Sequence, residues 1–439
     1  MSGSPNLGSI STRLRRIAQL AREDRKRSFL SLAHNIDEFW LYEAYSRTRK
    51  DGAAGIDGQT AKDYEQNLGE NLRSLLGRFK SGLYRAPPVR RVEIAKDNGS
   101  SRPIGIPTFE DKVLQRAVAM VLAAVYEEDF LDCSYGFRPG RSAHDALRVV
   151  RQELSELGGG WVLEVDIRSF FDELDHDHMR TFLDRRVRDG VIRKAIGKWL
   201  QAGVMQEGCI RHPEMGTPQG GVISPLLANI YLHEVVDRWF AEEVEPRLRG
   251  RARLVRYADD LVIVFGDEAD ARRVAEVLPK RLARFGLRLH PEKTRLVQFR
   301  RPPWGSDGSG PDGPGTFDFL GFTHFWGKTR QRGAWAVKRS TAASRFARSM
   351  NRMRERCRLR RHDPVAEQQR QLSRALRGHY GYYGITGNFR ALDNFYRQVT
   401  REWRKWLDRR SGKKSMPWER FNAFLSQFPL PRPKILHAV

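Results

Sequence analysis

The sequence feature that most constrains the fold is a pair of adjacent carboxylates, Asp259 and Asp260, between two short apolar stretches. Leu254–Tyr257 precedes the pair and Leu261–Phe265 follows it, so the pattern predicts a strand, a tight turn and a second strand. Neighbouring carboxylates repel each other unless water or a cation neutralises them. An Asp-Asp pair is usually a solvated turn, but a pair held between apolar strands is a more specific signal of a cation site.

A third carboxylate in a similar setting supports that hypothesis. Asp166 lies near the end of the apolar stretch Trp161–Ile167, 93 residues before Asp259. Hard cations prefer oxygen ligands. Two Mg²⁺ ions about 3.5–4 Å apart can activate a 3′-hydroxyl and stabilise departing pyrophosphate. The pattern therefore predicts Asp166, Asp259 and Asp260 as catalytic residues that hold two Mg²⁺ ions.

Charge and composition restrict the partners. The 439 residues include 78 Lys and Arg against 53 Asp and Glu, a net charge of +25, which indicates nucleic acid before an anionic membrane. The longest apolar run, Ala117–Tyr126, is half the length of about 20 residues that a membrane-spanning helix needs, so we expect a buried helix and no membrane partner. Cys133, Cys209 and Cys357 are too few for a disulfide scaffold and fit a reducing compartment.

The order of elements favours an α+β fold. Residues 1–85 are expected to be a helical N-terminal extension, and Val89–Ala95 with Arg102–Pro107 reads as a β-hairpin. Helices are expected near Met179–Gly203, Pro225–Arg238 and Ala271–Phe285. Strands that alternate with helices indicate a polymerase-like palm.

The C-terminal third differs in composition. Residues 301–316 form a Gly- and Pro-rich loop. Lys328–Arg361 contains 13 basic residues and one acid, and its arginines are expected on every face of a helix held against phosphates. The nucleic-acid-binding candidates are Arg345, Arg348, Arg352 and Arg356; a solvated helix face is the alternative. Most of the aromatic residues that follow are expected in a core, with stacking on bases as the alternative for the others.

Several motifs occur in one order along nearly the whole chain, and together they resemble a reverse transcriptase of the group II intron type with its maturase region. The motifs are Gly55-Ile56-Asp57-Gly58, Arg102–Pro107, Ser134–Ser142, Asp166–Asp172, Gly216–Gly221 with Ser224–Asn229, Tyr257–Asp260, Leu289–Thr294 and Phe319–Phe322. The resemblance implies a right-hand polymerase, with fingers and an antiparallel palm sheet at 86–300 and 317–335, followed by a helical thumb or maturase domain at 336–439.

The resemblance also assigns site residues. The carbonyl of Ile167 would be a further metal ligand, and Lys96 and Arg102 would close on the incoming triphosphate. Phe171 would exclude a ribose 2′-hydroxyl, with a plain core aromatic as the alternative. Gln219 and Gly220 would shape the nucleotide pocket or form only a turn, and Lys293 would protonate pyrophosphate or be a surface lysine.

The implied function is an RNA-directed DNA polymerase that uses an RNA template, a DNA primer or target and deoxynucleotides, and that also binds its intron RNA. No Cys- and His-containing endonuclease follows Trp418, so cleavage of the second DNA strand is not expected. The alternatives are a domesticated relative in phage defence, repair or CRISPR adaptation, a splicing factor with incidental polymerase activity, and an RNA-dependent RNA polymerase, which Phe171 disfavours. Bacterial cytoplasm is the expected location, with an organelle as the alternative; the sequence carries no signal of oligomeric state.

Overall fold

The sheets of this protein form where apolar and polar residues alternate, and its helices form where apolar residues recur every three or four positions. The computed structural model describes residues 7–95, 101–206, 209–211, 220–303, 315–329, 333–410 and 416–439. The chain packs as two compact units: the first comprises Met1–Ser142, Val165–Leu261 and Ala269–Arg295, and the second comprises Ala143–Glu164, Val262–Glu268 and Leu296–Val439.

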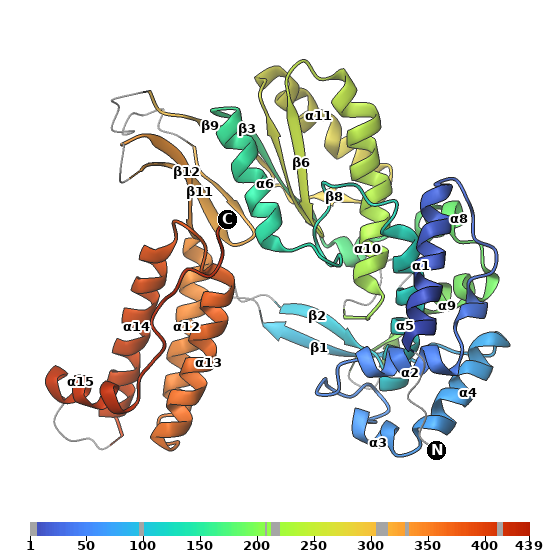
Figure 1. Cartoon of the computed structure of the whole chain (residues 1–439), viewed down its shortest axis with the longest axis horizontal. Helices are drawn as coiled ribbons and strands as arrows, with labels where there is room; N and C mark the ends of the chain where they lie inside the picture. The colour runs from blue at the N-terminus through green and yellow to red at the C-terminus, as the bar shows by residue number, and fades with distance from the viewer. Residues whose placement is uncertain are drawn as a thin grey trace. The chain divides into compact units, whose positions relative to one another are not determined.

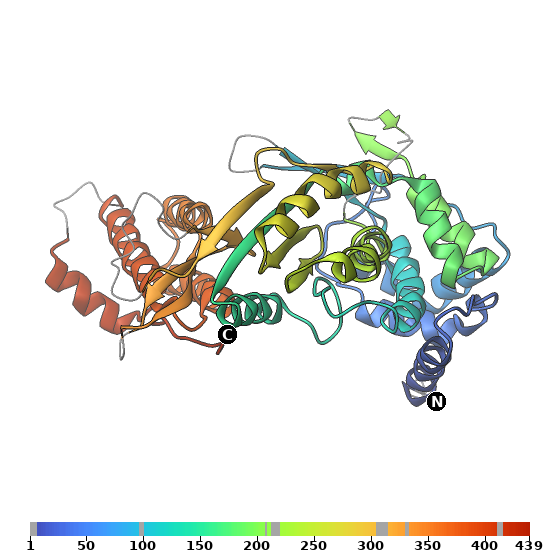
Figure 2. The same ribbon diagram turned by 90° about the horizontal axis from the view of Figure 1, so that it is seen from above.

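The predicted β-hairpin is confirmed. Strands β1 (Val89–Ala95) and β2 (Ser101–Ile106) pair antiparallel, as Figure 1 shows. The short strand β4 (Val204–Gln206) pairs in parallel with β1 and antiparallel with β5 (Cys209–Arg211), which extends the sheet to the order β2-β1-β4-β5 (Figure 2, light green arrows for β4 and β5).

The apolar stretches around the acidic pair and before Asp166 are strands of one five-stranded sheet. Its order is β6-β7-β3-β8, with β9 also paired to β3. The strands are β6 (Ala252–Tyr257), β7 (Asp260–Phe265), β3 (Gly159–Arg168), β8 (Arg288–Leu289) and β9 (Arg295–Arg300). The five apolar residues of β7 are buried, so the hydrophobic effect holds this strand in the middle of the structure.

A third sheet lies in the second unit. It contains β10 (Phe317–Phe319), β11 (Phe322–Lys328) and β12 (Trp335–Thr341), all antiparallel. Leu320 and Gly321 form the two-residue turn between β10 and β11, and both have positive φ, +50° and +80°. A positive φ at both central residues is typical of a tight hairpin turn, which gives the Phe319–Phe322 motif a physical reason.

The first unit contains most of the helices of the N-terminal two thirds of the described chain. They are α1 (Leu7–Glu23), α2 (Glu38–Arg47), α3 (Ala61–Glu65), α4 (Leu68–Lys80), α5 (Phe109–Tyr126), α7 (Phe170–Glu173), α8 (His176–Arg186), α9 (Gly190–Leu200), α10 (Ser224–Leu232) and α11 (Glu268–Ala283, except its first residue). As expected, the apolar run within α5 is largely buried. Among the described residues, every helix is too short or too polar to span a bilayer.

The helical structure expected near Met179–Gly203 is confirmed, as two helices, α8 and α9, with a break between them. Asp189, at the break, is buried and uses both carboxylate oxygens as caps. Oδ1 accepts hydrogen bonds from the N–H groups of Val191 and Ile192 in α9, and Oδ2 accepts from those of Leu32 and Ala33. One carboxylate therefore satisfies the start of a helix and an N-terminal turn at the same time.

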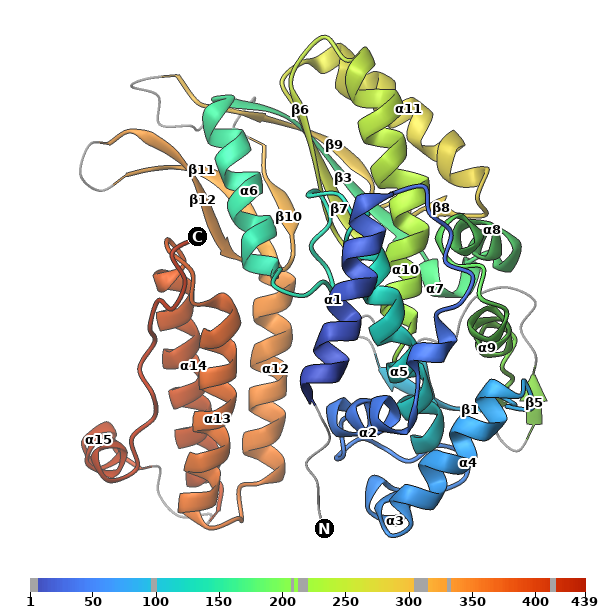
Figure 3. The same cartoon turned by 45° about the vertical axis from the view of Figure 1, so that its right-hand side comes forward.

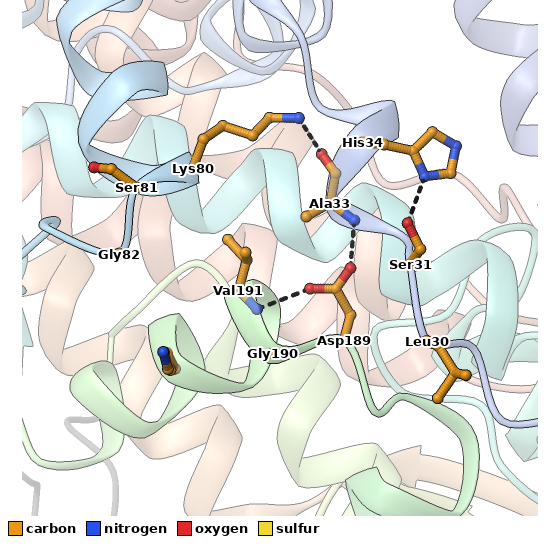
Figure 4. A pocket seen from close by; sticks show the side chains of 11 residues that line it. Leu30, Ser31, Ala33, His34, Lys80, Ser81, Gly82, Asp189, Gly190 and Val191 are labelled. Atoms are coloured by element: carbon orange, nitrogen blue, oxygen red, sulfur yellow. Dashed lines mark hydrogen bonds between the residues drawn. The ribbon is translucent and has the colours of Figure 1, made fainter.

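A cavity of about 460 Å³ lies beside Asp189, and Figure 4 shows its lining. Lys80 Nζ donates to the Ala33 carbonyl oxygen across it, at 2.6 Å. None of the predicted site residues lines this cavity. It belongs to the packing of the N-terminal segment against α4 and α9.

The second unit contains α6 (Ala143–Glu156) and four C-terminal helices, of which α12, α13 and α14 run side by side in Figure 3. The bounds are α12 (Ala343–Leu359), α13 (Val365–Tyr383), α14 (Phe389–Asp408) and α15 (Trp418–Gln427). Their shared core includes Tyr380, Phe395, Tyr396 and Trp403, so the expectation that most of the C-terminal aromatic residues are buried is confirmed for these four.

Two expectations about the basic segment are wrong. The helix does not cover Lys328–Arg361, because residues 335–341 pair with β11 as strand β12, and α12 begins only at Ala343. Nor do arginines occupy every face of α12. Met350, Met353 and Cys357 form a buried stripe against the helical core, so α12 is amphipathic and its arginines take the remaining faces.

The helical core predicts a large stability loss for Trp403→Ala. Trp403 is 1% exposed and its Nε1 donates to the buried Gln368 Oε1 at 3.0 Å. The substitution leaves a cavity and an unpaired acceptor, so we expect the free energy of unfolding to fall by about 3–5 kcal/mol. Urea denaturation followed by circular dichroism measures it. Phe389→Ala, at an exposed position of the same helix, should change it by less than about 0.5 kcal/mol; equal losses would contradict this account.

Candidate active site

The strand register brings the upstream and downstream acids to the same end of the central sheet. A Cβ atom on Gly160 would lie 2.4 Å from the carbonyl oxygen of Phe265, so the start of β3 lies against the end of β7. The strands must run antiparallel, since a parallel alignment at this point would leave almost no residues paired. The end of β3, which carries Asp166, therefore points toward the start of β7, where Asp259 precedes the strand and Asp260 begins it.

Asp166 already faces a cation. Lys293 Nζ lies 3.0 Å from Asp166 Oδ2, and the two side chains are 59% and 39% exposed. The backbone explains the approach: Ile167 pairs with Leu289 in β8, and the His290 N–H donates to the Asp166 carbonyl oxygen at 2.8 Å. The turn after β8 therefore carries Lys293 to the end of β3.

Carboxylate oxygens, which Asp166, Asp259 and Asp260 all carry, are the ligand type that a hard divalent cation prefers. Asp166 and Asp259 are partly exposed and Asp260 is exposed, so their oxygens are accessible from solvent. Lys293 forms an ion pair with Asp166, which shows that positive charge is favoured beside this carboxylate. Within the described residues, no three His, Cys, Asp or Glu side chains are gathered closely enough to form a ready metal cluster. A metal ion bound at Asp166 would therefore replace the Lys293 ammonium as the positive charge beside this carboxylate.

The loop of the Ser134–Ser142 motif packs against the acidic turn, a contact that the motif alone does not predict. The Ser134–Ser142 block begins with a parallel bridge between Ser134 and Arg256 of β6. A Cβ on Gly136 would lie 2.4 Å from the Ala258 nitrogen, so only glycine fits there. Phe137, with φ +59°, is 60% exposed and lies 6.4 Å from the Tyr257 ring. Its left-handed backbone could not be foreseen from residue type.

The predicted nucleotide contacts are described only in part. Lys96 and Gln219 lie outside the described residues, as does the side chain of Arg102, whose backbone pairs with Ile94 in the β1–β2 hairpin. Gly220 has φ +120°, and a Cβ there would lie 2.5 Å from the Gly105 carbonyl oxygen. The glycine therefore permits a close approach to β2, and its role toward a nucleotide stays a prediction.

Phe171 follows a strained residue at the end of β3. Ser169 has φ +43°, which turns the chain into the short helix α7. Phe170 is buried, whereas Phe171 is only partly buried, with the two rings in edge contact at 5.3 Å. Phe170 therefore fills the core, which leaves Phe171 available for a partner outside it.

The four arginines predicted to bind nucleic acid lie on α12 at spacings of three and four residues. Arg345, Arg352 and Arg356 are exposed and Arg348 is half-buried. Burial raises the pKa of Tyr383, and the positive charges of Arg345, Arg348 and Arg352 oppose that change, which indicates that these cations lie near this tyrosine. The arginines and the buried Met350–Met353–Cys357 stripe therefore occupy different faces of the helix.

A buried polar network supports the backbone near Gly220. Asp111 Oδ1 accepts hydrogen bonds from Tyr84 Oη and Trp199 Nε1, and Oδ2 accepts from Gln115 Nε2 at 3.0 Å. Gln115 Oε1 in turn accepts from the Ile223 N–H at 3.3 Å. Burial raises the pKa of Asp111 to about 6, and the three hydrogen bonds oppose that rise without cancelling it.

This carboxyl predicts a pH-dependent stability. Since the pKa of Asp111 is higher in the folded chain than its ordinary 3.8, the folded state binds the proton more tightly. The contribution is fully present below pH 3.8 and is lost as pH rises through about 6, for a total of about 3 kcal/mol. Urea denaturation between pH 4 and pH 7 measures it, and Asp111→Asn should flatten the slope. Parallel curves for parent and variant would exclude Asp111 as the source.

Acids at the ends of neighbouring sheet strands, with a basic helical region after the sheet, are the arrangement expected of a polymerase of the nucleotidyltransferase class. Comparison with known proteins agrees. The family described as Reverse transcriptase (RNA-dependent DNA polymerase) matches residues 94–324, more than half of the chain. The chain belongs to this reverse transcriptase family, and its relatives identify the group II intron type, with RNA-directed DNA polymerase as its enzyme class.

The similar proteins include intron proteins. The chain is 36% identical to Protein YkfC of Escherichia coli (strain K12) over 324 residues, which is 65% of this chain and 84% of that protein. It is 38% identical to the Group II intron-encoded protein LtrA of Lactococcus lactis subsp. cremoris over 222 residues, 47% of this chain and 36% of LtrA. It is 39% identical over 164 residues to an uncharacterized 91 kDa protein in the cob intron of Schizosaccharomyces pombe, 37% of this chain and 20% of that protein.

Proposed function

We propose that this chain copies RNA into DNA by two-metal nucleotidyl transfer and binds an intron RNA to assist splicing and mobility. The observation that carries the proposal is that β3, which bears Asp166 near its end, neighbours β7, which Asp259 precedes and Asp260 begins. A fold alone does not need three acids there, because like charges at one sheet end are destabilising without a cation.

The roles of the chain's own residues follow from their positions. Asp166, Asp259, Asp260 and the Ile167 carbonyl oxygen would hold the ions. A bound pair of Mg²⁺ ions would supply activation of a primer 3′-hydroxyl and neutralise charge on the leaving pyrophosphate. Lys293, 3.0 Å from Asp166, is close enough to the site to give a proton to that pyrophosphate. Lys96 and Arg102 would bind the triphosphate, with Gln219 and Gly220 at the pocket wall.

The RNA-binding part of the proposal has separate support. The exposed arginines of α12 repeat every three to four residues, which suits contact with successive phosphates along a duplex. LtrA, matched over 47% of this chain, is named as a group II intron-encoded protein. We therefore assign Arg345, Arg348, Arg352 and Arg356 to RNA, and we expect intron RNA and template to be the partners of this face.

Asp259→Ala tests the polymerase function. The variant loses a proposed metal ligand, so dNTP incorporation on an RNA template with a DNA primer should fall by more than about 100-fold. Loss of a residue that only supports a metal ligand already lowers activity by up to about 100-fold. Asp177→Ala, which removes an equally negative side chain that is 88% exposed on α8, is the control and should stay active. RNA affinity, measured by filter binding, should be similar in both variants; a parent without Mg²⁺-dependent incorporation would end the proposal.

Phe171→Ala tests the sugar gate. Removal of the partly exposed ring opens space beside the sugar, so incorporation of ribonucleotides relative to deoxynucleotides should rise at least about tenfold. Phe171→Tyr keeps the ring and should keep the parent's selectivity. Steady-state kcat/KM for the matched rNTP and dNTP gives the ratio, and an unchanged ratio in Phe171→Ala would assign the ring to packing.

A further inference from the structure

Arg256, the residue just before the Tyr257–Asp260 tetrad, has every donor of its guanidinium occupied. Nε and Nη2 donate to the two oxygens of Asp237, at 2.7 and 2.5 Å. Nη2 also donates to Ser134 Oγ at 2.8 Å, and Nη1 donates to Asn229 Oδ1 and to the Ala258 carbonyl oxygen at 3.0 and 3.1 Å. A guanidinium has five N–H groups, and all five have a partner here.

This arginine and its counter-ion are fully buried. Arg256 and Asp237 are both 0% exposed. Burial alone would raise the pKa of Asp237, but the charge and hydrogen bonds of Arg256 outweigh it and hold the pKa at about 2. Buried ion pairs are often no more stabilising than apolar residues of similar volume, because desolvation cancels much of the attraction. Stability is therefore a weak reason for this pair, and geometry is a better one.

The bond to Ala258 reaches the catalytic turn itself. Ala258 has φ +58°, a left-handed conformation that costs an L-residue free energy and persists only where its surroundings hold it. Arg256 binds its carbonyl oxygen from one side. On another side, Gly136 packs against the Ala258 nitrogen, and Asn229 Nδ2 binds the Gly136 carbonyl oxygen at 2.7 Å. Asn229 therefore connects the two supports of the turn.

We propose that Arg256 is a positioning residue: through the Ala258 carbonyl it fixes the direction in which Asp259 and Asp260 leave the turn, and so their readiness to bind divalent metal ions. The inference rests on the proposed function for the identity of the metal ligands. It predicts that a weakened Arg256 lowers metal affinity and kcat while leaving the KM for dNTP nearly unchanged.

Arg256→Lys is the principal variant, because lysine keeps the charge but offers three donors on a point charge that cannot span five acceptors. The matched control is Arg186→Lys. Arg186 is also buried, pairs with Asp129 at 2.8 Å, and donates to the backbone oxygens of Ala21, Asp24 and Arg27. None of these partners belongs to the acidic turn, so Arg186→Lys measures the effect of weakening a buried arginine elsewhere in the same unit.

The experiment measures Mn²⁺ binding to the full chain without nucleic acid, by electron paramagnetic resonance, with thermal unfolding recorded in parallel. Asp259→Ala defines the signal of the proposed site. Arg256→Lys should weaken Mn²⁺ binding by about 10- to 100-fold, and the Mg²⁺ concentration for half-maximal dNTP incorporation should rise by a similar factor. Arg186→Lys should lower the unfolding temperature but leave both the Mn²⁺ affinity and the Mg²⁺ concentration for half-maximal incorporation unchanged.

Should Arg256→Lys fail to fold, Asn229→Ala decides instead, since it removes only the bonds to Arg256 and Gly136 and should shift Mn²⁺ affinity in the same direction by a smaller factor. Parental Mn²⁺ affinity in a folded Arg256→Lys, or an equal loss in Arg186→Lys, overturns the positioning role even when the parent is an active polymerase. A parent that binds Mn²⁺ through Asp259 but copies no RNA ends the polymerase proposal and leaves the positioning role standing.

Discussion

The pairing of β3 with β7 is the constraint on which the rest of the site depends. Backbone hydrogen bonds between antiparallel strands have a fixed register, and a slip of one residue would turn every side chain to the opposite face. Gly160 approaches Phe265 where β3 begins and β7 ends, so the end of β3 that carries Asp166 points toward the start of β7, beside Asp259 and Asp260. The buried residues of β7 hold the alignment, so the apolar core at one end determines where the charges lie at the other.

The strands around the site could be predicted from the sequence because their signal is local. Val89–Ala95 and the stretches on either side of Asp259 and Asp260 combine apolar runs with turn residues, and the structure has strands there. The contact that joins the start of α9 to the N-terminal segment could not be predicted, because it is not local. Asp189 caps α9 through the N–H groups of Val191 and Ile192, and its other oxygen binds those of Leu32 and Ala33, more than 150 residues earlier in the chain.

In the candidate site, too, local features could be predicted from the sequence and contacts between distant residues could not. The three acids could be proposed from the sequence because carboxylates at strand ends are a chemical signal in themselves. Arg256 was not recognised, since a single arginine in an apolar strand gives no hint that Asp237, Asn229 and Ser134 will converge on it. The pairing of Lys293 with Asp166 depends on the β3–β8 register. Strand β8 has only two residues, which is too short for a recognisable strand pattern in the sequence. Strand β12 was hidden by its basic residues, which suggested a continuous helix.

The two-sided cap made by Asp189 has a consequence for how the N-terminal segment moves. Because its two oxygens serve the start of α9 and the Leu32–Ala33 turn, neither element can lose its cap bonds to a rotation of this side chain without the other losing them as well. The amide hydrogens of Leu32, Ala33, Val191 and Ile192 should then exchange with solvent through one shared opening event, as a single cooperative unit assembled from distant parts of the chain.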